Sequence, residues 1–181
     1  MNLAINMKDI QEVIVFDTEI NSATIGNFLT HIHRIIKQID ESKILIYFSS
    51  NGGSFTHADL MLNYINSMKD NIILLAFHQI SSAAFKVFFE FRGQKDIMDN
   101  TFSVIHKGSK NILARDLDNT DSFDFFMTNK MMPVMNKQVI KLYKSIGLSK
   151  TELKKIDNGK DLMLHTERLC KILRKNKYEK N

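Results

Sequence analysis

The chain has 181 residues, of which 44% are hydrophobic and 25% charged, and its formal net charge is +5. This length fits one folded domain over residues 1–181, with a core that needs no disulfide or metal to hold it. Much of the positive charge lies in a basic C-terminal tail at about 171–181. No aromatic platform for stacked bases accompanies these charges, so we expect no nucleic-acid partner.

The single cysteine, Cys170, cannot form a disulfide within the chain. Residues 1–7 lack the basic and apolar regions of a secretory signal, and the apolar runs of the chain are too short to cross a bilayer. None of the six histidines has a partner at metal-ligand spacing. The sequence therefore predicts a cytoplasmic protein with no membrane contact, no metal and no cofactor.

Continuous apolar runs predict strands, and the segments between the first three have the three- and four-residue spacing of amphipathic helices. The strands are 13–16, 44–48, 72–77 and 102–105, and the helices are 25–39 and 57–68. Runs of this kind are typical of parallel strands that are buried on both faces. We expect an α/β fold of repeated β-α-β units, with helices on each side of the sheet.

Further helices follow the third strand. Residues 82–91 are apolar almost all round, which predicts a central helix with Gly93 as its C-terminal cap. The segment 122–146 has a long helical pattern that Pro133 should kink or divide. Ser149 with Glu152 forms a capping-box pattern, which predicts the start of a last short helix.

Several residues suited to acyl transfer follow the ends of predicted strands, where sites lie in open parallel sheets. Gly52 and Gly53 follow the second strand, Ser82 follows the third, and His106 ends the fourth. Ser82 would be the nucleophile, His106 its base, and the N–H groups of Gly53 and Ala83 the donors to the oxyanion. Each residue alone also fits a turn, a helix cap or a buried histidine.

A histidine base also needs a carboxylate that orients its ring. Asp157, after the last short helix, is the predicted acid, and Asp161 is the alternative. Acidic residues are common in this region and most are solvated, so the spacing alone does not decide between them.

These residues also resemble the proteolytic subunit of the Clp protease family, serine peptidases of the Clp/crotonase fold. Residues 43–54 are similar to the family's strand and asparagine-serine-proline-glycine-glycine-serine segment, with Asn51 in the proline position. Residues 77–84 are similar to the nucleophile segment, and Gln79 sets the register that matches Ser82 with the nucleophile. Residues 103–106 resemble the strand that ends in the catalytic histidine.

The resemblance covers about residues 13–161 and implies a protruding handle helix in the region of about 107–146. It implies an endopeptidase that hydrolyses peptide bonds of short or unfolded chains by a Ser-His-Asp acyl-enzyme mechanism inside an oligomeric chamber. Family members stack heptameric rings through the handle. The apolar residues suited to that packing, which also fit an intramolecular core, are Phe123, Phe125, Phe126, Met127, Met131, Met132 and Met135.

Some positions depart from the family pattern. Ala83 and Ala84 replace a methionine and a glycine, His78 replaces a glycine, and the spacing before Asp157 is about one residue longer. Few residues precede the first strand, so the axial loops that contact the family's ATPase are expected to be missing, and we expect no Clp ATPase partner. Two alternatives stay open: a catalytically silent subunit of a mixed ring, and a crotonase-like acyl-CoA enzyme.

Overall fold

The structure, a computed structural model, describes residues 7–38, 42–108 and 130–178. Contacts between residues divide the chain into two compact units. The first unit combines the N-terminal part, up to Ile105, with the C-terminal part from Met163, and the second unit is His106–Leu162. We describe each unit separately.

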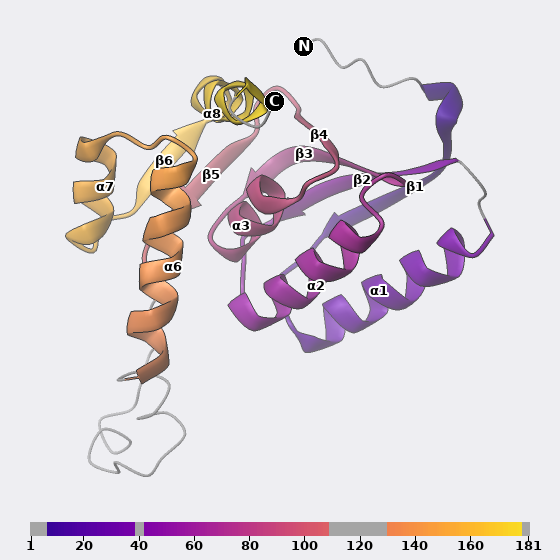
Figure 1. The fold of residues 1–181 in the computed structure, drawn as a ribbon, viewed down its shortest axis with the longest axis horizontal. Coiled ribbons are helices and arrows are strands. Elements are labelled where there is room, and N and C mark those ends of the chain that lie inside the picture. Colours follow the sequence, from indigo (N-terminus) through magenta and orange to yellow (C-terminus); the bar gives the residue numbers. More distant parts are fainter. Residues whose placement is uncertain (1–6, 39–41, 109–129, 179–181) are drawn as a thin grey trace. The chain divides into compact units, whose positions relative to one another are not determined.

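The first unit is built on a mainly parallel sheet (Figure 1). Its strands are β1 (Ile10–Asp17), β2 (Lys43–Ser50), β3 (Ile72–Ile80), β4 (Gln94–Ile97), β5 (Phe102–Ile105) and β6 (Leu162–His165), and a 3-10 turn, η1 (Met7–Asp9), precedes them. The strand order is β1-β2-β3-β5-β6, and β4 pairs with β3 alongside that path. The α/β fold and the four predicted strands are confirmed, whereas the sequence analysis missed β4 and β6.

Three helices connect these strands as the apolar spacing predicted: α1 (Ser22–Ile36), α2 (Phe55–Ser67) and α3 (Ala83–Glu90). A further helix, α8 (Thr166–Tyr178), follows β6. Asn21 and Thr24 begin α1 with a capping box, in which each side chain bonds to the backbone N–H of the other at 3.0 and 3.1 Å. The side chain of Ser54 caps α2 by accepting the N–H of His57. Local hydrogen bonds therefore fix where both helices begin.

The core of the first unit lies between the sheet and the helices that follow β1 and β2. Phe16 of β1 packs edge-on against Phe28 of α1 and stacks on Phe48 of β2, with ring centroids 4.9 and 5.6 Å apart. The alternate residues of β1 are open to solvent, since Val13 is 50% and Val15 64% exposed. The expectation of helices on both faces is therefore wrong at β1, whose other face is uncovered.

Helix α3 ends differently from the prediction. Gly93 is not its cap, because the helix stops at Glu90 and Phe91 is already extended. The ammonium of Lys95 instead donates hydrogen bonds to carbonyl oxygens in the last turn of the helix, at 2.9 Å to Phe88 and 2.8 Å to Phe89. Gly93 serves close packing, since a Cβ there would lie 2.5 Å from the carbonyl oxygen of Lys69.

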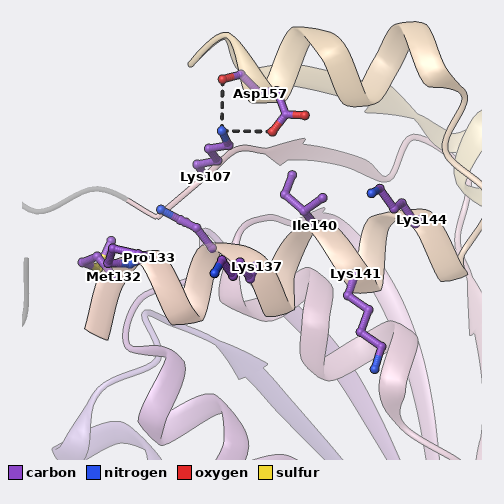
Figure 2. Close-up of a pocket in the computed structure, with 9 residues that line it drawn as sticks. Lys107, Met132, Pro133, Lys137, Ile140, Lys141, Lys144 and Asp157 are labelled. Carbon is purple, nitrogen blue, oxygen red and sulfur yellow. Dashed lines mark hydrogen bonds and ion pairs between the residues drawn. The ribbon is translucent and has the colours of Figure 1, made fainter. Parts of the chain in front are cut away.

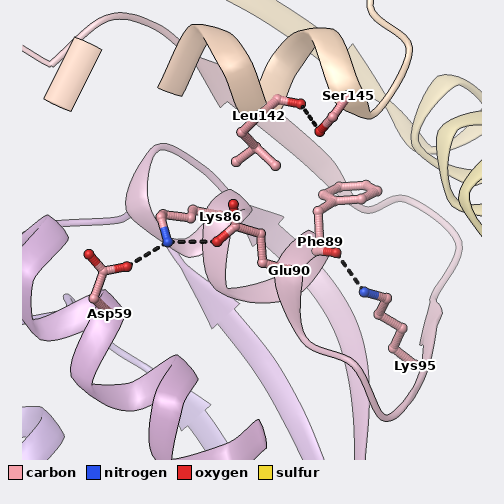
Figure 3. A network of polar contacts seen from close by, with 7 residues as sticks. All are labelled: Asp59, Lys86, Phe89, Glu90, Lys95, Leu142 and Ser145. Atoms are coloured by element: carbon pink, nitrogen blue, oxygen red, sulfur yellow. Dashed lines mark hydrogen bonds and ion pairs between the residues drawn. The ribbon is translucent and has the colours of Figure 1, made fainter. Parts of the chain in front are cut away.

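A charged group on α3 ties this helix to its neighbour (Figure 3). The ammonium of Lys86 lies 2.6 Å from Glu90, one turn further along α3, and also bonds to Asp59 of α2. Burial lowers the pKa of Lys86, but the hydrogen bonds and charges of Asp59 and Glu90 outweigh it and raise the pKa above its ordinary value. The start of α3 is thereby held against α2.

The second unit contains α6 (Met132–Ser145) and α7 (Lys150–Asp157). Pro133 lies in the first turn of α6, where its missing N–H removes no helical hydrogen bond, so it does not kink the described helix. The predicted capping box of α7 is confirmed, with both bonds between Ser149 and Glu152 present. Residues 122–129, and with them Phe123, Phe125, Phe126 and Met127 of the predicted apolar surface, lie outside the described residues.

Among the helices that the structure describes, none combines the length and the apolar character needed to cross a membrane.

Candidate active site

Ser82 occupies a sharp turn between β3 and α3. Its backbone has φ 51° and ψ −120°, a left-handed conformation that residues other than glycine rarely adopt. The turn is held from both sides, because the N–H of Ser81 donates to Ser50 at 2.9 Å and that of Ser82 to Val104 at 3.0 Å. Strained strand-to-helix turns of this kind present a nucleophilic serine in other hydrolases.

The adjacent Ser81 has a structural role instead. It is 3% exposed, and its hydroxyl oxygen accepts the N–H of Val104 at 2.7 Å and the side-chain amide of Gln79 at 2.9 Å. Ser82 is more exposed than Ser81 and makes no capping hydrogen bond with its side chain. The geometry agrees with the register in which Ser82, and not Ser81, is the candidate nucleophile.

The glycine pair lies directly against this turn. Gly52 has φ 107°, and a Cβ on it would lie 2.7 Å from Cβ of Ser82 and 3.1 Å from the nitrogen of Ala83. Gly53 has φ 133° and forms a β-bridge with Ile20. A Cβ on Gly53 would clash with the carbonyl oxygen of Ile20. Both positions therefore need glycine, for the backbone angle and for the close approach.

Two backbone donors of the glycine pair and the Ser82 turn have no acceptor among the described residues. Neither the N–H of Gly53 nor that of Ala83 makes a hydrogen bond within the part of the chain that the structure describes. The bridge to Ile20 uses the carbonyl of Gly52 and the N–H of Ser54 instead, each at 2.8 Å. Gly53 directly follows Gly52, which packs against Ser82, and Ala83 directly follows Ser82.

His106 belongs to the second unit and directly follows β5. Its Nδ1 lies 3.8 Å from a carboxylate oxygen of Asp161, and its side chain is 37% exposed. The hydroxyl of Tyr143 donates to its carbonyl oxygen at 3.2 Å, which fixes the backbone. Burial raises the pKa of Tyr143, and the hydrogen bond to His106 only partly offsets this, so the phenol stays a proton donor.

Asp157, the acid predicted from the sequence, has another partner (Figure 2). Its carboxylate lies 3.0 Å from the ammonium of Lys107, which also donates to the Asp157 carbonyl at 3.0 Å. The alternative acid, Asp161, is the carboxylate that lies near His106, at 3.8 Å from its Nδ1.

The candidate residues are therefore distributed over both units. Gly53, Ser82 and Ala83 are together in the first unit, while His106 and the two aspartates are in the second. Sequence analysis did not single out Lys107 or Tyr143. The position of Lys107 directly after the candidate base is the only local signal for it, and Tyr143 has none. Across residues 7–38, 42–108 and 130–178, no group of three or more His, Cys, Asp or Glu side chains could hold a metal.

The sequence matches the family model for Clp protease over residues 4–168, a span that contains every candidate residue above. This chain belongs to the Clp protease family. No curated protein matches the sequence.

Membership of the Clp protease family is accompanied by a similar fold. A solved structure of a ClpP1 mutant from Listeria monocytogenes matches with a TM-score of 0.66 and 17% sequence identity, over 88% of this chain and 86% of that one. At this identity the likeness shows the fold alone. It supports the Clp-type α/β architecture over nearly the whole chain, while the place of α6 as a handle helix stays a prediction.

Proposed function

We propose that this Clp protease family member is a serine endopeptidase that hydrolyses peptide bonds through an acyl-enzyme. The hydroxyl oxygen of Ser82 attacks the carbonyl carbon of the scissile bond, and His106 takes the hydroxyl proton. The tetrahedral oxyanion accepts the N–H groups of Gly53 and Ala83. Collapse of this intermediate breaks the C–N bond as His106 returns the proton to the leaving amine, and water then hydrolyses the ester.

The observation that carries this proposal is the left-handed backbone of Ser82, with Gly52 packed against it. Among the described residues, the N–H groups of Gly53 and Ala83, which directly follow Gly52 and Ser82, have no acceptor. The dipole of α3 favours negative charge at its first turn, which suits both the attacking oxygen and the oxyanion. Losing one such donor typically lowers turnover about 100- to 1,000-fold. A plain helix cap would account for the serine but not for its backbone angle.

We propose further that residues 1–181 form a single peptidase domain, and that peptides or unfolded proteins are its substrates.

A catalytically silent subunit of a mixed ring is the second candidate. The contact between Asp157 and Lys107 favours it, because a carboxylate held by a lysine does not orient an imidazole. An acyl-CoA enzyme has no comparable support, since that reaction gives Ser82 and His106 no roles.

Labelling with a fluorophosphonate probe tests the proposal. We expect the wild-type chain to be labelled and Ser82→Ala to be unlabelled, because the probe reacts with activated serines. Ser81→Ala is the matched control, since it removes a neighbouring hydroxyl that the proposal assigns to packing. Absence of labelling in the folded wild type would favour the silent subunit, and labelling that survives Ser82→Ala would rule out Ser82 as nucleophile.

A further inference from the structure

The second unit contains a cavity of about 640 Å³ (Figure 2), a size typical of ligand pockets. One wall is formed by α6, and Lys107 with Asp157 forms another part of the lining. The side chain of Asn136 exchanges two hydrogen bonds with the backbone of Gly108, at 2.8 and 3.3 Å, so this part of the wall is fixed. All lining residues belong to the second unit.

The lining of this cavity is strongly cationic. Lys137, Lys141 and Lys144 follow one another at four- and three-residue intervals, which places them on one face of α6. Within the described residues no carboxylate lies within 4.0 Å of any of these three ammonium groups. Asp157, the one acidic lining residue, is already paired with Lys107.

Such an arrangement is unfavourable when the cavity holds only water. Like charges at these intervals destabilise a helix, and concave walls strengthen the potential that the three lysines create. An anion in the cavity would relieve this repulsion. The charges therefore indicate a ligand with several negative groups.

The remaining lining residues narrow the class of ligand. Met132, Pro133 and Ile140 add an apolar part, which suits a ligand that carries side chains as well as charges. None of the described residues that line the cavity is aromatic, so this lining offers no stacking surface for the bases of a nucleic acid. A peptide fits these walls better than a nucleic acid does.

The spacing of the lysines also fits a peptide. Neighbouring lysines are separated by about 6 Å and about 4.5 Å along the axis of α6. In an extended peptide, side chains two positions apart lie on one side at about 6.8 Å. Lysine side chains are flexible enough to span the difference.

We propose that this cavity binds an acidic segment of a peptide, with carboxylates at alternate positions that pair with Lys137, Lys141 and Lys144. This inference rests on the proposed peptidase function in one respect, since the bound peptide would be the substrate. It adds a substrate class, because acidic peptides would be held next to the candidate acid Asp157.

Fluorescence anisotropy with the full chain tests the inference, in the Ser82→Ala background so that no peptide is cleaved. The probe is a fluorescein-labelled peptide with glutamate at alternate positions, and its matched partner has glutamine in their place. We expect the glutamate peptide to bind about tenfold more tightly or better, and this difference to shrink between about 0.05 M and about 0.5 M salt.

Charge reversal identifies the site. Lys141→Glu with Lys144→Glu should reduce affinity for the glutamate peptide to that of the glutamine peptide. Lys154→Glu with Lys155→Glu, which changes the net charge equally on the exposed face of α7, should leave it within about twofold of the parent. If the first pair of changes unfolds the chain, Lys141→Gln with Lys144→Gln replaces it, with the same expected loss.

Several outcomes would overturn the inference. They are equal affinity for the two peptides, unchanged binding by the Lys141 and Lys144 variants, an equal loss in the Lys154 and Lys155 variant, and stronger binding of an oligothymidylate of the same charge. Cleavage is measured separately with the wild type. Binding without cleavage would contradict the proposed function alone, and cleavage without preference for acidic peptides would contradict the inference alone.

Discussion

At the scale of single residues, the least expected feature is the partner that each of the two aspartates has. The position of Asp157 after the short helix predicts it as the acid, but its carboxylate lies 3.0 Å from Lys107. Asp161 lies 3.8 Å from Nδ1 of His106, which is longer than a hydrogen bond. Either carboxylate would have to approach the imidazole during the reaction, and both are exposed enough to move.

Substitution of each aspartate separates the two assignments. We expect Asp157→Asn to lower kcat by about 10⁴-fold, as loss of the orienting acid does in other triads, and Asp161→Asn to lower it by less than about tenfold. Steady-state hydrolysis of a fluorogenic peptide measures both. The reverse order of effects would assign the role to Asp161, and two small effects would show that the mechanism uses no acid here.

At the scale of elements, the position of Ser82 depends on how α3 is held. Lys86 joins α3 to α2, and its side chain is 15% exposed. The ion pair between Lys69 and Asp70 has the same charges, but it joins neighbouring residues and is 45% and 85% exposed. Only the first contact links two elements, so the two pairs should differ in their effect on stability.

We expect Lys86→Met to lower the free energy of unfolding by about 1–3 kcal/mol at neutral pH, because two carboxylates lose a partly buried partner. Lys69→Met, the matched control, should change it by less than about 1 kcal/mol. Urea denaturation at fixed protein concentration measures the free energy of unfolding of both variants. Equal losses would show that Lys86 does not stabilise the contact between α3 and α2.

The pH dependence of this difference has a defined sign. Because the pKa of Lys86 is raised in the folded chain, its stabilising contribution is complete below the ordinary lysine value of 10.5 and is lost as the pH rises through the higher folded value. Between neutral pH and pH 10.5 the free-energy gap between the wild type and Lys86→Met should therefore stay constant, and it should narrow above pH 10.5. A gap that already narrows between neutral pH and pH 10.5 would contradict this account.

At the scale of the whole molecule, membership of the Clp protease family supports assembly into rings. The start of α6 carries exposed apolar side chains, since its N-cap residue Met131 is 37% and Val134 49% exposed. Apolar groups exposed next to one another are typical of interfaces. We propose that they take part in contacts between copies of the chain.

Light scattering coupled to size exclusion tests this assembly. We expect a mass well above the 21.0 kDa of one chain at micromolar concentration, and dissociation by Val134→Lys. Leu60→Lys on α2 is the matched control, because Leu60 is similarly exposed, at 53%, and should leave the mass unchanged. A wild type that elutes as a monomer would contradict the proposed assembly of several copies into an oligomeric chamber.

The sequence by itself determined the features that depend on neighbouring residues. Apolar runs placed four strands, side-chain caps placed the start of α7, and the glycine pair before Ser82 indicated acyl-transfer chemistry. These signals are local, since burial period and capping need only a few adjacent residues. The strand β4, with the sequence Gln-Lys-Asp-Ile, has no apolar run and could not be found in this way.

Only the tertiary structure decided which groups meet. The hydroxyl of Ser81 accepts hydrogen bonds from Gln79 and from the N–H of Val104, a residue 23 positions away, and no pattern of neighbouring residues indicates the contact with Val104. The pairing of Lys107 with Asp157 joins residues 50 positions apart. Such contacts depend on how the chain folds back on itself, which spacing along the sequence does not specify. For the same reason the glycine pair was visible in the sequence, whereas its packing against Ser82 was not.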